Sequence, residues 1–118
     1  MYRFHFEPGQ EAIYALLRSL GLLAEHTYFF HTAYAVCLLL ENQERICCVT
    51  KWLYPEVARH YGTTPSAVER NIRFALSQVW AREPRLLAHM AGYPLLKRPT
   101  TRRFLAILAR YLSENRAA

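Results

Sequence analysis

The chain has 118 residues, of which 53% are hydrophobic and 20% charged. This balance is typical of one globular domain and excludes a disordered chain. Lysine and arginine number 15 against 9 glutamates, 13 of the 15 are arginine, and aspartate is absent. The net charge of +6 favours an acidic partner, nucleic acid first, and the lack of aspartate excludes a Ser-His-Asp triad and phosphoaspartyl chemistry.

The longest uninterrupted apolar run, residues 33–40, is far too short to span a bilayer, and the first ten residues lack the apolar segment of a signal peptide. Three cysteines, Cys37, Cys47 and Cys48, include no CxxC pair. They predict reduced thiols, without a disulfide framework or a zinc site. We therefore expect a cytoplasmic protein with no cofactor, no metal, no membrane contact and no small-molecule substrate.

Helical periodicity runs along most of the chain. The helices that it predicts cover residues 9–20, 27–40, 46–61, 64–82, 85–91 and 100–113. Pro55 either kinks the third of these helices or begins a separate one. Tyr2, Phe4 and Phe6 alternate as in a strand but are too few to form a sheet. The prediction is an all-α fold of about six helices, with an N-terminal extension over 1–8, the domain over 9–114 and a fraying tail over 115–118.

A helix-turn-helix motif is indicated around residues 58–68. Ala58 supplies the small residue of the first helix, Gly62 the turn, and Val68 the early apolar anchor of the second helix. The second helix begins either with Thr64 as N-cap and Pro65 as its first residue, or with a capping box from Ser66 to Glu69. Both alternatives place a helix start directly after the turn.

Burial of Val68 and Ile72 fixes which side chains of the second helix face solvent. Its outward, N-terminal side is the part that enters the major groove in this motif. The side chains predicted there to read bases are Ser66, Glu69, Arg70 and Arg73. The arginine fork matches guanine O6 and N7, a carboxylate accepts from a cytosine amino group, and Thr63 and Thr64 suit phosphate oxygens. The alternative is a plain Glu69–Arg73 ion pair on a capped surface helix.

The run VTKWLYPEVARHYGTTPSAVERNIRFALSQVWAR, residues 49–82, resembles the DNA-binding effector domain of the sporulation stage-zero master response regulator of endospore-forming bacteria. The pattern TTxSxVERxIR within it is the most specific part, and the resemblance extends over residues 10–114. It implies a six-helix effector domain of the winged-helix-like, response-regulator type. It also implies that Glu69 and Arg70 face bases of a short GC-containing box, that Arg73 lies at the DNA surface, and that copies bind tandem sites as dimers.

Three departures from the family stand out. Its regulators carry a receiver domain, so the resemblance predicts a stand-alone effector domain that phosphorylation does not control in cis. Asn71 replaces the usual alanine and is predicted either to contact adenine or the DNA backbone, or to be simply exposed. Lys97 and Arg98, with Arg102 and Arg103 after them, form a basic cluster that is predicted either to contact phosphates or to remain a solvated surface.

Two other functions are alternatives to DNA reading. A protein-interaction module that pairs with a full-length sporulation regulator would not need Glu69, Arg70 and Arg73. An enzyme would need a nucleophile such as Cys37 with His26 or His31, but Cys37 falls on an apolar helical stripe that favours a buried, inert thiol. The sequence therefore favours a DNA-binding transcriptional regulator that is not an enzyme.

Overall fold

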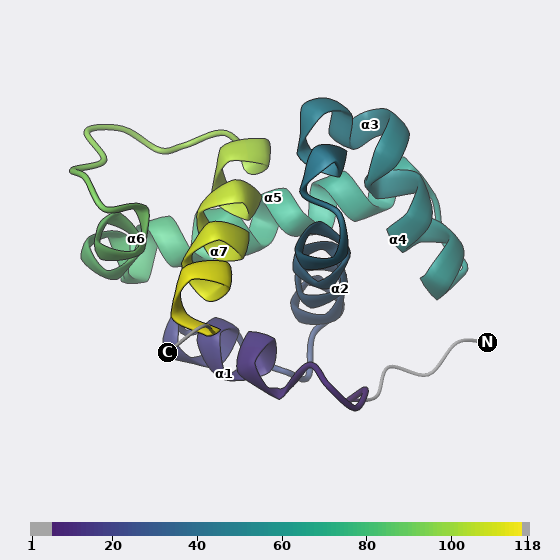
Figure 1. Ribbon diagram of the computed structural model, residues 1–118, viewed down its shortest axis with the longest axis horizontal. Coiled ribbons are helices and arrows are strands. Elements are labelled where there is room, and N and C mark those ends of the chain that lie inside the picture. The colour runs from purple at the N-terminus through teal and green to yellow at the C-terminus, as the bar shows by residue number, and fades with distance from the viewer. Residues whose placement is uncertain (1–5, 117–118) are drawn as a thin grey trace.

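The computed structural model describes residues 6–116, apart from the side chain of Arg116 (Figure 1). Its elements are α1 (Glu11–Ser19), α2 (Thr27–Glu41), the 3-10 helix η1 (Gln43–Cys48), α3 (Val49–Trp52), α4 (Tyr54–Tyr61), α5 (Pro65–Arg82), α6 (Pro84–Ala91) and α7 (Thr101–Arg116). Residues 6–116 contain no strand, which confirms the all-α prediction. Of the three alternating aromatic residues, Tyr2 and Phe4 lie outside the described residues.

The predicted helix over residues 46–61 is divided into separate elements, which include α3 and α4. The part of the chain that the structure describes therefore has one α-helix more than the six predicted. Residues 43–48 form the tight turns of η1, and α3 follows it for four residues. At Leu53 the backbone leaves the regular helix, and Pro55 stands in the first turn of α4, where its missing N–H costs no hydrogen bond. The second of the two expected outcomes at Pro55, a separate helix start, is therefore the observed one.

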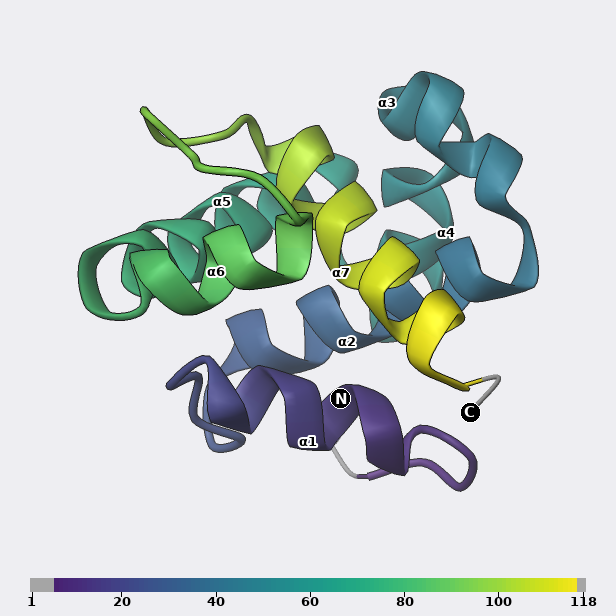
Figure 2. The same cartoon turned by 60° about the vertical axis from the view of Figure 1, so that its left-hand side comes forward.

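Helix α2 forms the centre of the core. It contacts α1, α4, α5 and α7, and Figure 2 shows it between α1 on one side and α5 with α6 on the other. Most of its residues are buried, including Phe29 and Leu39, and they share one core cluster with fully buried residues of α5 and α7 such as Leu76 and Phe104. This arrangement holds α5 along its inner side and leaves the outer side of α5 at the surface.

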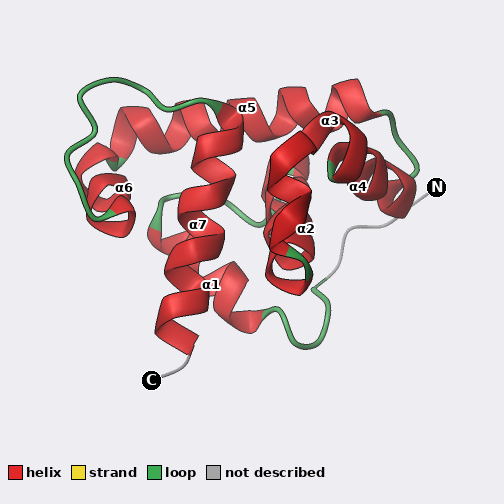
Figure 3. Cartoon of the chain, turned by 45° about the horizontal axis from the view of Figure 1, so that its top comes forward, coloured by secondary structure: helices red, strands yellow, loops and turns green. Residues whose placement is uncertain are grey.

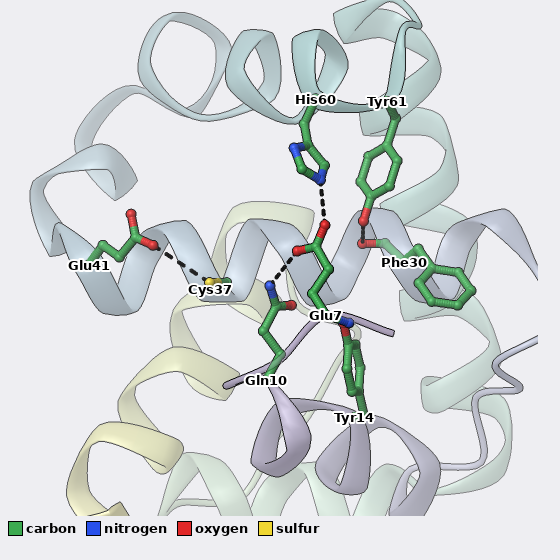
Figure 4. A network of polar contacts seen from close by, with 8 residues as sticks. All are labelled: Glu7, Gln10, Tyr14, Phe30, Cys37, Glu41, His60 and Tyr61. Atoms are coloured by element: carbon green, nitrogen blue, oxygen red, sulfur yellow. Dashed lines mark hydrogen bonds and ion pairs between the residues drawn. The ribbon is translucent and has the colours of Figure 1, made fainter. Parts of the chain in front are cut away.

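Glu7, in the described part of the N-terminal extension, connects this extension to α4 (Figure 4). One carboxylate oxygen lies 2.8 Å from Nε2 of His60 on α4, and the other accepts a hydrogen bond of 2.8 Å from the amide of Gln10. The backbone N–H of Glu7 also donates to the hydroxyl of Tyr14 at 3.0 Å. Residues 7–10 therefore bridge α1 and α4.

None of the three cysteines, which all lie among the described residues, forms a disulfide bond with another. Cys47 is exposed, while Cys37 and Cys48 are half-buried. The expected burial of Cys37 is only partial, because its thiol points toward Glu41 at 3.7 Å at the edge of α2. Within residues 6–116, no three His, Cys, Asp or Glu side chains gather as potential metal ligands, and no helix is long and apolar enough to cross a membrane.

Candidate nucleic-acid interface

The connection between α4 and α5 is a three-residue turn that begins at a left-handed glycine. Gly62 has φ +66°, and the N–H of Thr63 donates to the carbonyl of Ala58 at 2.9 Å, which closes the end of α4. A Cβ at position 62 would meet no atom within 4 Å. The glycine is therefore required by its backbone conformation rather than by crowding.

Helix α5 starts with a side-chain cap. Thr64 Oγ1 accepts a hydrogen bond of 3.1 Å from the N–H of Ala67, and Pro65 is the first helical residue. This is the first of the two predicted helix starts. The capping box from Ser66 to Glu69 is not formed, because the carboxylate of Glu69 contacts side chains of α5 and α7 instead.

The apolar side of the helix-turn-helix is buried as the spacing predicted. Val68 and Ile72 have no exposed surface, and Ala58 is buried where α4 and α5 pack together. The α4–turn–α5 unit is therefore a helix-turn-helix with α5 as its second helix. The opposite side of the first turns of α5 faces solvent.

The four residues predicted to read bases lie together. They line one shallow surface hollow, which is formed by Thr50, Tyr54, Pro65, Ser66, Glu69, Arg70 and Arg73. Ser66 and Arg70 are exposed, and the side chain of Arg73 keeps 55% of its surface exposed. Within residues 6–116 the guanidinium of Arg70 has no hydrogen bond or ion pair. Its full set of donors is therefore directed to solvent.

Three residues of this hollow, Thr50, Tyr54 and Pro65, were not predicted as site residues. Thr50 on α3 is exposed and Tyr54 at the start of α4 is buried. Burial, and after it the negative charge of Glu69, raises the pKa of Tyr54 to about 12. The phenol thus stays protonated at any ordinary pH. The run of residues 50–54 belongs to the sequence resemblance, and that was the only signal for Thr50 and Tyr54.

The carboxylate of Glu69 is held from two sides. Oε1 lies 3.3 Å from Nη1 of Arg73 one turn later in α5, and Oε2 accepts a long hydrogen bond of 3.5 Å from the hydroxyl of Thr101 on α7. The alternative of a Glu69–Arg73 surface pair is thus present, but the pair lies in the hollow beside Arg70. Forming the pair does not remove either residue from the surface.

The predicted backbone-contact residues Lys97 and Arg98 lie on the loop that runs from α6 to α7 past α5 (Figure 3). Both are exposed, and Nη2 of Arg98 donates to the backbone carbonyl of Arg73 at 3.2 Å. The loop is also tied to α7, because Nε of Arg103 donates to the hydroxyl of Tyr93 at 2.8 Å. The basic loop is therefore fixed at the flank of the hollow.

The chain also matches a known protein family over most of its length. A family model described as the sporulation initiation factor Spo0A C terminal matches residues 13–112. The chain belongs to this family. It is accordingly a helical DNA-binding domain of transcription regulation in sporulation.

One residue of the predicted DNA-contacting set lies apart from this family's candidate reading surface. Asn71 is half-buried, and its amide nitrogen lies 3.2 Å from Nδ1 of His31 on α2. Asn71 itself lines a different hollow, together with Tyr28 and Phe74. We therefore assign Asn71 to the packing of α5 on α2 and leave it out of the DNA-contacting set proposed below.

The partner of Asn71 is a neutral histidine in the core of the DNA-binding domain. His31 is 2% exposed, and its burial lowers its pKa from 6.5 to about 4. Its ring lies 5.1 Å from that of Tyr61 at the end of α4. The unprotonated Nδ1 can accept from the amide of Asn71. The Asn71–His31 contact joins α5 to α2, and the ring contact with Tyr61 adds α4.

Proposed function

We propose that the chain is a sequence-specific transcriptional regulator that reads a short box in the major groove with the N-terminal half of α5. The observation that carries the proposal is the exposed Arg70, which has no partner among residues 6–116 and lies in one hollow with Ser66, Glu69 and Arg73. A planar guanidinium with free donors suits guanine O6 and N7, the commonest specific contact to a base pair.

The roles of the other base-reading residues follow from their chemistry. Glu69 is an acceptor and suits a cytosine amino group, since each carboxylate oxygen retains a free lone pair beside its present contact. Arg73 is one turn further along the helix and half-exposed, so it reaches the edge of the same groove. Ser66 can either donate or accept at the first turn. A mixed Glu-Arg surface of this kind favours sequence reading over simple charge attraction.

Backbone contacts are proposed on both flanks of the reading residues. Thr63 and the free N–H groups at the start of α5 face the phosphates on one side, and Thr64 contributes mainly by capping the helix there. Lys97 and Arg98 lie on the other side. Only one guanidinium nitrogen of Arg98 is engaged with Arg73, so the remaining donors are available to a phosphate oxygen.

Binding to tandem boxes as a pair of copies is the further part of this proposal. It is supported by the resemblance of the chain to regulators that bind in this way. The stoichiometry and the affinity of the protein are measured on duplexes that carry one box or two boxes. If two copies pair on DNA, the second copy binds a two-box duplex more tightly than a single copy binds a one-box duplex. Equal affinities of the two copies for their boxes would contradict pairing.

The experiment that tests the proposed function is selection of bound sequences from random duplex DNA at near-physiological salt. The expected result is enrichment of one short box that contains G·C pairs, because Arg70 and Glu69 both favour them. Salt near the physiological value suppresses the non-specific attraction of a basic protein to phosphates. Binding without enrichment of any sequence would contradict the proposal.

A further inference from the structure

The base-reading carboxylate of α5 makes a contact outside the helix-turn-helix. Oε2 of Glu69 is 3.5 Å from Oγ1 of Thr101, the first residue of α7, while Oε1 is 3.3 Å from Arg73. We propose that Thr101 is a positioning residue, which holds Glu69 in the orientation that reads its base pair. This inference rests on the proposed function and adds to it a determinant of specificity from outside the helix-turn-helix, on α7.

The two contacts of the Glu69 carboxylate restrict different motions of this group. Arg73 is on the same helix as Glu69, so their ion pair alone leaves the carboxylate free to rotate about its own axis. The hydroxyl of Thr101 approaches from a second helix and engages the other oxygen. Two contacts from different directions fix both the position and the plane of the carboxylate. The remaining lone pairs are then oriented in advance for an amino group of a base.

Thr101 can do this because the start of α7 is rigid. Thr100 caps the helix by accepting a hydrogen bond of 3.1 Å from the N–H of Arg103. The N–H of Phe104 donates to the carbonyl of Thr100 at 2.9 Å, and the Phe104 side chain is fully buried. Helices α5 and α7 also contact each other directly. The hydroxyl is therefore placed by the core rather than by a mobile surface segment.

The burial of Glu69 is consistent with a held side chain. The exposed fraction of its side chain is 32%, compared with 55% for the side chain of Arg73. An ordered glutamate has already lost its rotamer freedom before DNA arrives, so less entropy is lost on binding. If Thr101 supplies this order, its removal affects the base pair read by Glu69 and leaves the base pair read by Arg70 unchanged.

The experiment uses the full chain and the box obtained by selection, with a set of duplexes that each change one base pair. The Glu69→Ala variant first identifies the base pair at which preference depends on the carboxylate. Thr101→Val removes the hydroxyl with little change in shape, and Thr101→Ser retains it. We expect Thr101→Val to lower the preference at that base pair by about two- to tenfold, the size of one hydrogen bond. Thr101→Ser keeps the preference.

Two controls separate positioning from a general effect on α7. Thr100→Ala removes the helix cap next to Thr101 and is expected to lower the thermal midpoint without changing the preference at the Glu69 base pair. In the Glu69→Ala background, Thr101→Val is expected to change no preference at all, because the carboxylate on which it acts is gone. A purely structural role of Thr101 would not vanish in this way.

The outcomes distinguish this inference from the function on which it rests. If Glu69→Ala loses the preference and Thr101→Val keeps it, or if Thr101→Val weakens binding equally on every duplex, the positioning role is overturned and DNA reading by α5 stands. If neither Glu69→Ala nor Arg70→Ala changes any preference, the proposed function fails and the positioning role fails with it.

Discussion

The two flanks of α5 carry polar side chains that are held in different ways. On the outer flank, Arg70 is exposed and unpaired among residues 6–116, and Glu69 and Arg73 contact each other within the same hollow. On the other flank, Asn71 turns toward the core and meets the buried His31. The outer flank keeps the donors of Arg70 open to solvent, whereas the inner flank uses the amide of Asn71 to hold α5 on α2.

This difference follows from helix geometry. Successive residues of an α-helix are separated by about 100° around its axis, since one turn takes 3.6 residues. Once Val68 and Ile72 are fixed in the core, Arg70 points outward and Asn71 lies at the boundary with α2. These adjacent polar residues therefore face different surroundings, solvent for Arg70 and α2 for Asn71.

The largest expected effect comes from His31, the partner of Asn71 on the inner flank. It is a dependence of the free energy of unfolding on pH. The folded state keeps His31 neutral down to a pKa of about 4, whereas the unfolded chain takes up the proton near 6.5. As the pH falls through this window, the unfolded state binds the extra proton, and the free energy of unfolding falls by roughly 3 kcal/mol. Urea unfolding of the wild type and of His31→Gln between pH 7 and 4.5 measures the difference, and parallel curves would contradict the buried neutral ring.

Removal of Arg70 tests the outer flank. Arg70→Ala is expected to weaken binding to the selected box by about 1–3 kcal/mol and to relax preference at one base pair. The free energy of unfolding should change by less than about 0.5 kcal/mol, because the side chain is exposed and unpaired among residues 6–116. Binding titrations on the box and on a scrambled duplex give the comparison. Equal losses on both duplexes would place Arg70 on a phosphate.

Asn71→Ala, one residue after Arg70, is expected to affect stability and leave DNA binding unchanged. The variant loses the hydrogen bond to His31 and should be less stable by about 1 kcal/mol, with its preference among boxes unchanged. Chemical denaturation and binding to the selected box are both measured. If the variant loses its preference among DNA sequences and keeps its stability, Asn71 contacts DNA and this assignment is wrong.

The smallest effect at a fixed salt concentration is expected from the flanking loop. Replacing Lys97 and Arg98 by alanine should weaken binding on every sequence and flatten the plot of log affinity against log salt by up to about 2 units, near 0.9 per phosphate contact. Arg110→Ala is the matched control, since Arg110 is exposed but pairs with Glu114 in the last turns of α7. An unchanged slope in the loop variant would place Lys97 and Arg98 away from DNA.

Much of the fold and of the candidate site was accessible from the sequence. Helical periodicity predicted α1, α2, α5, α6 and α7, because apolar residues recur at helical spacing in each of them. The helix-turn-helix followed from local requirements, a small residue at Ala58, a left-handed residue at Gly62 and a buried anchor at Val68. The grouping of Ser66, Glu69, Arg70 and Arg73 then followed from the helical period alone.

What could not be predicted depends on contacts between distant segments. The pairing of Asn71 with His31 joins residues 40 positions apart, and the contact of Thr101 with Glu69 joins residues 32 apart. No local pattern encodes which of the polar residues near Glu69 reaches it. The division of the predicted 46–61 helix had a local signal in Pro55, but that signal allowed both a kink and a break.

The central claim is that Arg70 reads a guanine, and substitution of single atoms in the DNA tests it most directly. Each guanine of the selected box is replaced in turn by 7-deazaguanine, which lacks the N7 acceptor, and binding of the wild type and of Arg70→Ala is measured. We predict that one replacement weakens binding of the wild type by about tenfold and has no effect on Arg70→Ala. The claim is contradicted if every replacement affects both proteins equally.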